Sequence, residues 1–422
     1  MSDRPAAPAL PAPKPDRPIL QVLGNSHFRT LWGSSWMWNS SRWMWQIISG
    51  YIVLQLTDSP FLVQMVGVAF TGPQLLGAVL GGAIADSLGR KTTLLIAHGM
   101  NLTLAVFTAG LVLSGRAEAW HILVLTLLAG SANTLDSVTR RTFVSEIIPR
   151  PLLSFSLALE AMAMMGSGVV GPWIGGALVD VVPLGTAGAA TPYMVITGLY
   201  VLSLVLLLRV PGHLARQAQR RGVGDTIASI GEGLRYVAGN RAVLGTLTLT
   251  LGWNFFFAPY QTLIPVIAVK ELGVNSTLMG ILGGAQGAGS LIGTLFIATR
   301  PGISRNSVYY VFGTLTALTC LLAFSLSTIY PLSVALLIVA GIGGSGFVTM
   351  QATLVLLAVR EDMRARAMGA LNMAIGVLPL GTLTLGILAQ SIRPSLAVTI
   401  MASIGVVWVA FWGWRAKEMR KL

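Results

Sequence analysis

Long apolar stretches, interrupted by short polar segments, recur along nearly the whole chain. A helix needs about 20 mainly apolar residues to cross a bilayer. Twelve stretches approach or exceed that length, at residues 29–56, 61–85, 92–114, 120–142, 152–179, 188–211, 243–268, 277–299, 307–328, 331–358, 367–391 and 395–415. We expect helices because an unpaired backbone polar group is costly in lipid, and the alternating pattern of a β-barrel is absent from the sequence.

The predicted spans fall into two groups of six, which indicates an all-α membrane protein with two six-helix bundles, at residues 28–211 and 241–422. The second bundle ends in a short basic tail. Residues 212–240 carry apolar side chains at spacings of three and four, which predicts an amphipathic helix on the cytoplasmic membrane surface. Residues 1–27 are rich in proline and lack the apolar core of a signal peptide, so we expect a disordered cytoplasmic tail.

The charge of the chain follows this topology. Charged residues are only 10% of the chain, whereas a soluble domain carries about 25%. If the N-terminus is cytoplasmic, all but four of the 28 Lys and Arg fall in cytoplasmic segments, and the exceptions are Arg42, Arg116, Lys270 and Arg393. This asymmetry predicts a multi-pass protein of the inner membrane with both termini in the cytoplasm. The net charge of +13 therefore indicates topology, and no motif supports nucleic-acid binding.

Two motifs contain conspicuous glycines. After the second span, residues 82–91 resemble the loop signature of the major facilitator superfamily, with matches at Gly82, Asp86, Gly89, Arg90 and Lys91. In the fifth span, residues 167–176 resemble the antiporter motif of the same superfamily, with Ser167 in place of a glycine and matches at Gly171, Pro172, Gly175 and Gly176. Residues 133–141, 233–237 and 364–369 are similar to the enterobactin-exporter and macrolide-efflux branch.

The resemblance implies the major facilitator fold, alternating access, and proton-driven export of a small amphipathic molecule such as a drug, a macrolide or a siderophore. It also implies a gate in which Asp86 meets the start of the eleventh span near Arg366. An inward-directed carrier, a lipid flippase and a non-transporting sensor remain alternatives. The sequence holds no nucleophile elbow, P-loop or metal-binding pair, so we expect no enzyme, cofactor or metal. We expect a monomer whose partners are its substrate, protons and the bilayer.

Once the charges at the rims of the predicted spans are set aside, three charged side chains lie within spans: Arg42, Asp136 and Glu160. Each costs at least about 2.5 kcal/mol at the centre of an isolated helix, so each should face a cavity or a partner. We predict that Glu160 carries the proton, that Asp136 assists it, and that Arg42 faces one of these acids. The alternatives are an ion pair of Asp136 with Arg140 at the membrane rim, a purely structural hydrogen bond of Glu160, and a static charge partnership for Arg42.

The resemblance also implies that the first, fourth, seventh and tenth spans line the substrate cavity. Aromatic and amide side chains in these spans can stack on a substrate or bond to it. The predicted substrate contacts are Trp43, Trp45, Asn254, Tyr260, Gln261 and Gln351. The alternatives are lipid-facing tryptophans and polar contacts between helices.

Overall fold

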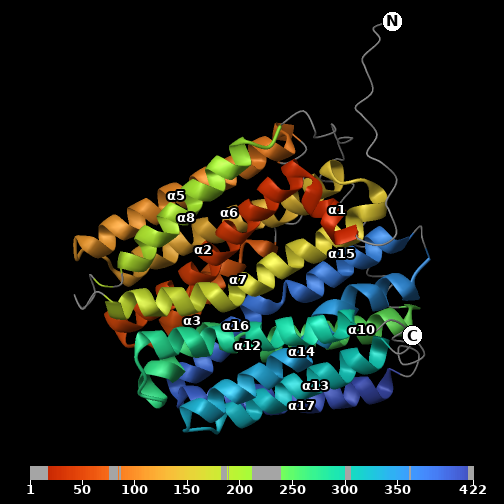
Figure 1. The fold of residues 1–422 in the computed structure, drawn as a ribbon. Coiled ribbons are helices and arrows are strands. Elements are labelled where there is room, and N and C mark those ends of the chain that lie inside the picture. The colour runs from red at the N-terminus through yellow and green to blue at the C-terminus, as the bar shows by residue number, and fades with distance from the viewer. Residues whose placement is uncertain are drawn as a thin grey trace, which may run out of the picture.

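A computed structural model of the chain describes residues 18–75, 84, 87–181, 188, 190–211, 239–299, 306–360 and 363–416. Within these ranges every regular element is a helix. The long helices run side by side, with the N-terminal half of the chain above the C-terminal half in Figure 1. The all-α fold that the apolar stretches predicted is confirmed. The expected linker helix at 212–240 lies almost entirely outside the described residues.

The N-terminal half contains seven α-helices: α1 (Pro18–Gly24), α2 (Ser26–Thr57), α3 (Pro60–Thr71), α5 (Arg90–Leu113), α6 (Ala119–Ile147), α7 (Leu153–Val181) and α8 (Ala190–Leu208) within the described ranges. Helix α1 corrects the expectation of a fully disordered tail, since residues 18–24 are helical. Val22 of α1 is fully buried in one apolar cluster with Phe28 and Leu31 of α2, and this burial favours the helix. Asn25 then starts α2 by accepting hydrogen bonds from the backbone N–H groups of His27 and Phe28.

The described part of the C-terminal half begins with a span broken into four pieces. These are α10 (Arg241–Gly252), the π-helical turn η4 (Trp253–Phe257), α11 (Tyr260–Val266) and a second π-helical turn η5 (Ile267–Glu271). Pro259 directly precedes α11 and Pro265 lies inside it, and proline cannot donate the backbone bond of a regular helix. The remaining helices are α12 (Ser276–Ala298), α13 (Asn306–Ser325), α14 (Tyr330–Ala358), α15 (Arg364–Ile375), α16 (Leu378–Ser391) and α17 (Pro394–Arg415).

The described helices are those of a multi-pass membrane protein. Ten helical segments in the described ranges are long and apolar enough to cross a membrane. Helix α2 is 32 residues long, but its serines, Asn39, Arg42 and Gln46 lower its mean hydropathy. Helix α3 is a shorter apolar helix, and described residues become sparse beyond position 75. The count of twelve spans therefore stays a prediction.

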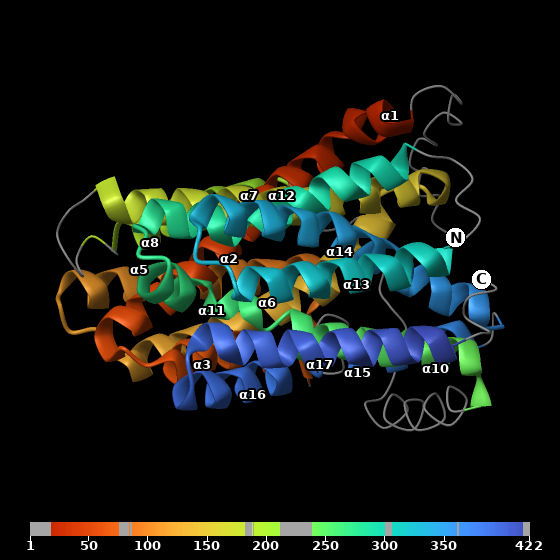
Figure 2. The ribbon, with the colours of Figure 1, turned by 90° about the horizontal axis from the view of Figure 1, so that it is seen from below.

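The two halves meet along α7 and α12, through glycines of both helices. A Cβ atom added at Gly176 of α7 would overlap the backbone oxygen of Ser276, and one added at Gly280 of α12 would overlap that of Pro172. Asp180 reinforces this contact by accepting hydrogen bonds from the backbone N–H and the hydroxyl of Thr277, at 2.8 and 2.6 Å. The contact lies toward the end of the bundle away from α1 and from the C-terminal end of α17 (Figures 1 and 2). We call this the closed end.

Replacing Gly176 by Ala should weaken closure at this end. The added methyl group has no room against α12, and such overpacking costs about 1–3 kcal/mol, enough to shift a balanced equilibrium roughly fivefold or more. Double electron–electron resonance between spin labels at Val181 and Val274, with Cys320 replaced, should show a larger share of long distances. Gly198→Ala is the matched control, because a Cβ at Gly198 meets nothing within 4 Å. Equal distance distributions in the two variants would contradict this role of Gly176.

Candidate functional site

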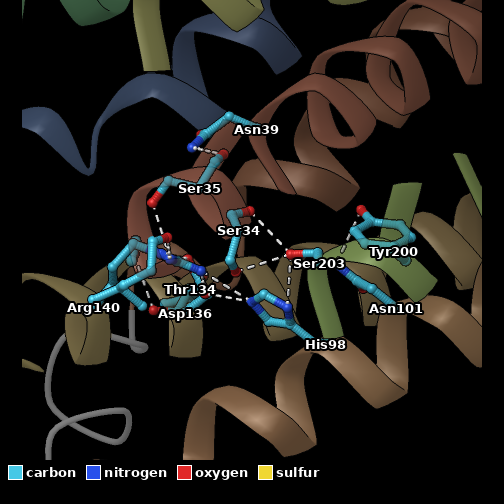
Figure 3. A network of polar contacts seen from close by, with 12 residues as sticks. Ser34, Ser35, Asn39, His98, Asn101, Thr134, Asp136, Arg140, Tyr200 and Ser203 are labelled. Carbon is cyan, nitrogen blue, oxygen red and sulfur yellow. Dashed lines mark hydrogen bonds and ion pairs between the residues drawn. The ribbon is translucent and has the colours of Figure 1, made fainter. Parts of the chain in front are cut away.

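A network of buried polar side chains lies between the helices of the N-terminal half (Figure 3). At its centre, Asp136 and Arg140 stand four residues apart on α6, and they are only 3% and 5% exposed. Arg140 Nε donates to Asp136 Oδ2 at 3.0 Å, and Nη2 donates to Oδ1 at 2.7 Å. This is a two-point ion pair, the strongest geometry that a carboxylate and a guanidinium adopt. The pair that the spacing allowed is therefore formed, but in the interior of the bundle.

The Nη1 group of Arg140 bonds to α2 and, through Ser35 of that helix, is linked to α7. Its Nη1 donates to Ser35 Oγ at 2.9 Å, and Ser35 Oγ in turn donates to Glu160 Oε2 at 2.6 Å. The other oxygen of Glu160, Oε1, is buried and has no hydrogen-bond partner among the described residues. Glu160 is thus linked to Arg140 through one hydroxyl and keeps one oxygen free. A carboxyl group in this position can gain or lose a proton without first breaking an ion pair.

His98 of α5 completes the network, and the sequence analysis missed it. Its Nε2 lies 3.0 Å from Asp136 Oδ1 and 3.0 Å from Arg140 Nη2. Its Nδ1 lies 3.1 Å from Ser203 Oγ of α8, and its ring stacks on Trp38 with centroids 4.2 Å apart. The ring is fully buried. The available signal was a titratable residue inside the predicted span 92–114.

Arg42 was predicted to face Asp136 or Glu160, and the structure shows it elsewhere. It forms no hydrogen bond or ion pair with Asp136 or Glu160 in the structure. Its guanidinium carbon lies 4.9 Å from the ring centroid of Trp43 and 5.6 Å from that of Phe70, which are cation–π distances. The buried Nε of Arg42 has no partner among the described residues. Arg140 is the cation that bonds to Asp136 and, through Ser35, reaches Glu160.

The predicted substrate contacts separate into two groups. Trp43 and Gln261 line a small, partly open cavity between α2, α7, α11 and α12, where the two halves meet. Gln261 Nε2 also donates to Gln286 Oε1 at 2.7 Å, and Tyr260 donates its hydroxyl to the same oxygen at 2.6 Å. Gln286 of α12 is therefore a further polar residue of this region, in a glycine-rich segment that the sequence analysis did not select.

The other predicted contacts are held inside the protein. Trp45 is 1% exposed, and its Nε1 donates to Thr126 Oγ1 at 3.2 Å. Asn254 donates to the backbone oxygen of Thr250 in its own span, at 2.9 Å. The buried Oε1 of Gln351 has no partner among the described residues. Trp45 is thus neither lipid-facing nor at the cavity, because it is buried and bonds to α6, and Asn254 bonds within its own span.

The loop signature is described only in part. Gly82 and Asp86 lie outside the described residues, so their predicted gate contact has no structural description. Gly89 has φ 83°, a backbone conformation that glycine adopts readily, and it precedes α5. Arg90 forms an ion pair with Glu146 of α6, and Lys91 donates to the backbone oxygen of Leu208 at 3.1 Å. Arg90 and Lys91 therefore tie the start of α5 to its own half.

Arg366 of the predicted gate lies in the first turn of α15, where its Nη1 is 3.5 Å from the sulfur of Met363. The gating role of Asp86 and Arg366 stays a prediction. The residues of the antiporter motif are better defined. Gly171 and Gly175 face α2, where an added Cβ would crowd Ser40 and Met44 respectively, and Gly176 faces α12. The small residues thus allow α7 to pack closely against both halves.

Comparison with protein families gives one that matches residues 19–420, described as transmembrane secretion effector. Similar relatives include the multidrug efflux pump Tap of Mycolicibacterium fortuitum, 24% identical over 353 residues, which are 81% of this chain and 84% of the relative. The enterobactin exporter EntS of Shigella boydii serotype 4 is 25% identical over 68% of this chain and 67% of the relative. The uncharacterized MFS-type transporter YfiS of Bacillus subtilis is 24% identical over 62% of this chain, and the match spans 60% of the relative.

Solved structures match the fold over nearly the whole chain. A POT family transporter in complex with a thioalcohol conjugated peptide has a TM-score of 0.73 at 11% identity, covering 96% of this chain and 100% of that one. The inward open xylose transporter XylE from E. coli has a TM-score of 0.69 at 14% identity, covering 94% and 96%. At such low identity these likenesses show the fold alone.

Proposed function

Since the chain belongs to the transmembrane secretion effector family of the major facilitator superfamily, in its enterobactin-exporter and efflux branch, we propose that it exports a small amphipathic molecule in exchange for protons. The fold and the family make it a membrane transporter of the efflux type. The observation that carries proton exchange is the Glu160 carboxyl, which is bonded to Ser35 through one oxygen and is unpartnered at the other. Efflux relatives and the antiporter motif support the outward direction.

The cycle that we propose uses the two states of Glu160. When ionised, Glu160 is stabilised by Ser35 and by the nearby charge of Arg140. When protonated, it is neutral and needs less of that stabilisation. A cavity open to the cytoplasm lets the proton leave and the substrate enter, and a cavity open to the outside lets the substrate leave and a proton return. The ion pair of Asp136 with Arg140 keeps the guanidinium close to Ser35 and Glu160.

Trp43 and Gln261 are the substrate contacts that we retain. They come from opposite halves and line one cavity, so a bound molecule would touch both halves at once. An aromatic ring and an amide suit an amphipathic molecule, because one offers apolar surface and the other hydrogen bonds. Movement of the halves during alternating access would change the shape of this cavity.

We further propose that both termini face the cytoplasm, with the closed end toward the outside. The uneven distribution of Lys and Arg supports this orientation. Cysteines placed at Ser2 and Arg220, after replacement of Cys320, should resist an impermeant thiol reagent in intact cells and react after permeabilisation. Labelling of either cysteine in intact cells would reverse the orientation and the assigned direction of transport.

Purified protein in proteoliposomes tests the function. With an imposed pH gradient and a panel of dyes, macrolides and siderophores, at least one compound should accumulate in the acidic compartment against its own gradient. Movement of a compound together with protons would favour the inward-directed alternative. Specific binding without any transport would favour a sensor.

A further inference from the structure

His98 lies between the two members of the central ion pair in a geometry that cannot satisfy all of its neighbours at once. Its Nε2 is 3.0 Å from Asp136 Oδ1, an acceptor, and 3.0 Å from Arg140 Nη2, a donor. A ring nitrogen either carries a hydrogen or offers a lone pair. Nε2 can therefore accept from Arg140 or donate to Asp136, and the choice depends on whether it is protonated.

The other ring nitrogen narrows the choice to two states. Ser203 Oγ lies 3.1 Å from His98 Nδ1 and 2.9 Å from the backbone oxygen of Ser34, to which it donates. Ser203 Oγ also lies 3.0 Å from Ser34 Oγ. A hydroxyl has one hydrogen, so in the arrangement in which Ser203 donates to the backbone oxygen of Ser34 it accepts from Nδ1, and Nδ1 then carries a hydrogen in both states of the ring. The neutral ring then has a free Nε2 that accepts from Arg140, and the protonated ring has an Nε2–H that donates to Asp136.

We propose that His98 is a positioning residue that couples its own protonation to the charge of Glu160, an inference that rests on the proton exchange proposed above. When Nε2 takes a proton from water, it donates to Asp136 and shares that carboxylate with Arg140. Arg140 loses an acceptor and gains a positive neighbour, so its guanidinium turns toward Ser35 and Glu160, where Oε1 is without a partner. Glu160 then releases its proton to water more readily. The network holds one proton, at His98 or at Glu160.

The charged groups that take part in this coupling with His98 are Asp136, Arg140 and Glu160. Helix α6 contributes the first two, and both touch the ring. Helix α2 presents Trp38 against the ring face, and α8 presents Ser203 at its edge. Tyr200 of α8 contacts Trp38 and receives a hydrogen bond from Asn101 of α5 at 3.3 Å. The side chains of α2 and α8 that touch the ring are thus uncharged near neutral pH. Arg42 of α2 is a further positive charge, and it interacts electrostatically with Asp136 without touching the ring.

Infrared difference spectroscopy of the purified full-length protein tests the coupling without a substrate. The carbonyl stretch of the protonated Glu160 is identified as the band that Glu160→Gln removes. In His98→Gln, which keeps hydrogen-bonding groups but cannot titrate, this band should appear on acidification at a pH about one unit higher than in the wild type. That is the change expected when the Glu160 carboxylate no longer gains the hydrogen bond from Arg140 that protonation of His98 favours.

Ser203→Ala supplies a second variant in case His98→Gln does not fold. It keeps the ring but removes the acceptor of Nδ1–H, so the band should move in the same direction by a smaller amount. His27→Gln on α2 is the control, and in this variant the Glu160 band should appear at the same pH as in the wild type. Unchanged titration in both test variants would overturn the role of His98 and would leave the proton exchange at Glu160 standing. A transport assay in which Glu160→Gln still uses the pH gradient would instead remove the proposed function.

Discussion

Replacing Arg140 by Gln should lower the free energy of unfolding by about 3–5 kcal/mol at neutral pH, the usual cost of removing one partner from a buried ion pair. The change takes away both hydrogen bonds to Asp136 and the bond to Ser35, and it leaves the carboxylates of Asp136 and Glu160 in the interior without a cation bonded to either. Thermal unfolding in a mild detergent should show the loss. The loss should shrink as the pH falls, because protonation neutralises the two acids.

Arg141→Gln is the matched control for this prediction. Arg141 is the next residue of α6 and is exposed, so its replacement should change stability little. Comparable melting temperatures for Arg140→Gln and Arg141→Gln would mean that the ion pair contributes nothing to the fold. A loss that does not depend on pH would mean that Arg140 acts through packing of its side chain.

Glu160→Gln should abolish transport driven by a pH gradient while it leaves binding and equilibrium exchange largely intact. Glutamine keeps the size of a protonated glutamate and can still accept the hydrogen bond from Ser35, but it has no proton to release. Accumulation against the substrate gradient, with only a pH difference supplied to proteoliposomes, should fall to the level of protein-free vesicles. Exchange of labelled for unlabelled substrate at equal pH should continue.

Two further carboxyl variants separate a specific role from a general effect of charge. Glu118→Gln removes an exposed carboxyl just before α6, and it should transport normally. Asp136→Asn should have a smaller effect on coupling than Glu160→Gln if Asp136 serves only to hold Arg140. An equal effect would mean that the two acids share the work. If Glu160→Gln still concentrates the substrate, Glu160 is structural.

The central part of the network, Asp136, Glu160 and Arg140, was predictable because each residue could be recognised from its own charge or from its spacing within one helix. Charged residues in apolar stretches are costly, which singled out Asp136 and Glu160, and a spacing of four placed Arg140 on the same face as Asp136. Ser35 and Ser203 were not predictable in this way. A serine is inexpensive in a span and occurs on many helix faces, and its role here depends on which helices pack together.

The fold likewise has features that the local sequence predicts and features that depend on tertiary packing. Helix positions followed from the length of apolar stretches, since the bilayer sets that length. The break of the seventh predicted span around Pro259 and Pro265 did not follow, because a proline in a membrane helix can kink it or interrupt it, depending on its neighbours. Trp45 was predicted as a substrate contact because it is an aromatic residue of the first span, and only the tertiary structure shows its bond to Thr126.

Proton movement during transport tests proton exchange most directly. Proteoliposomes with wild-type protein, a pH-sensitive dye inside and no initial pH gradient are loaded with a transported compound and diluted into compound-free buffer. As the compound leaves, protons should enter, so the interior should become more acidic, and Glu160→Gln vesicles should show no such change. Efflux of the compound from wild-type vesicles without acidification, or with alkalinisation, would contradict proton exchange.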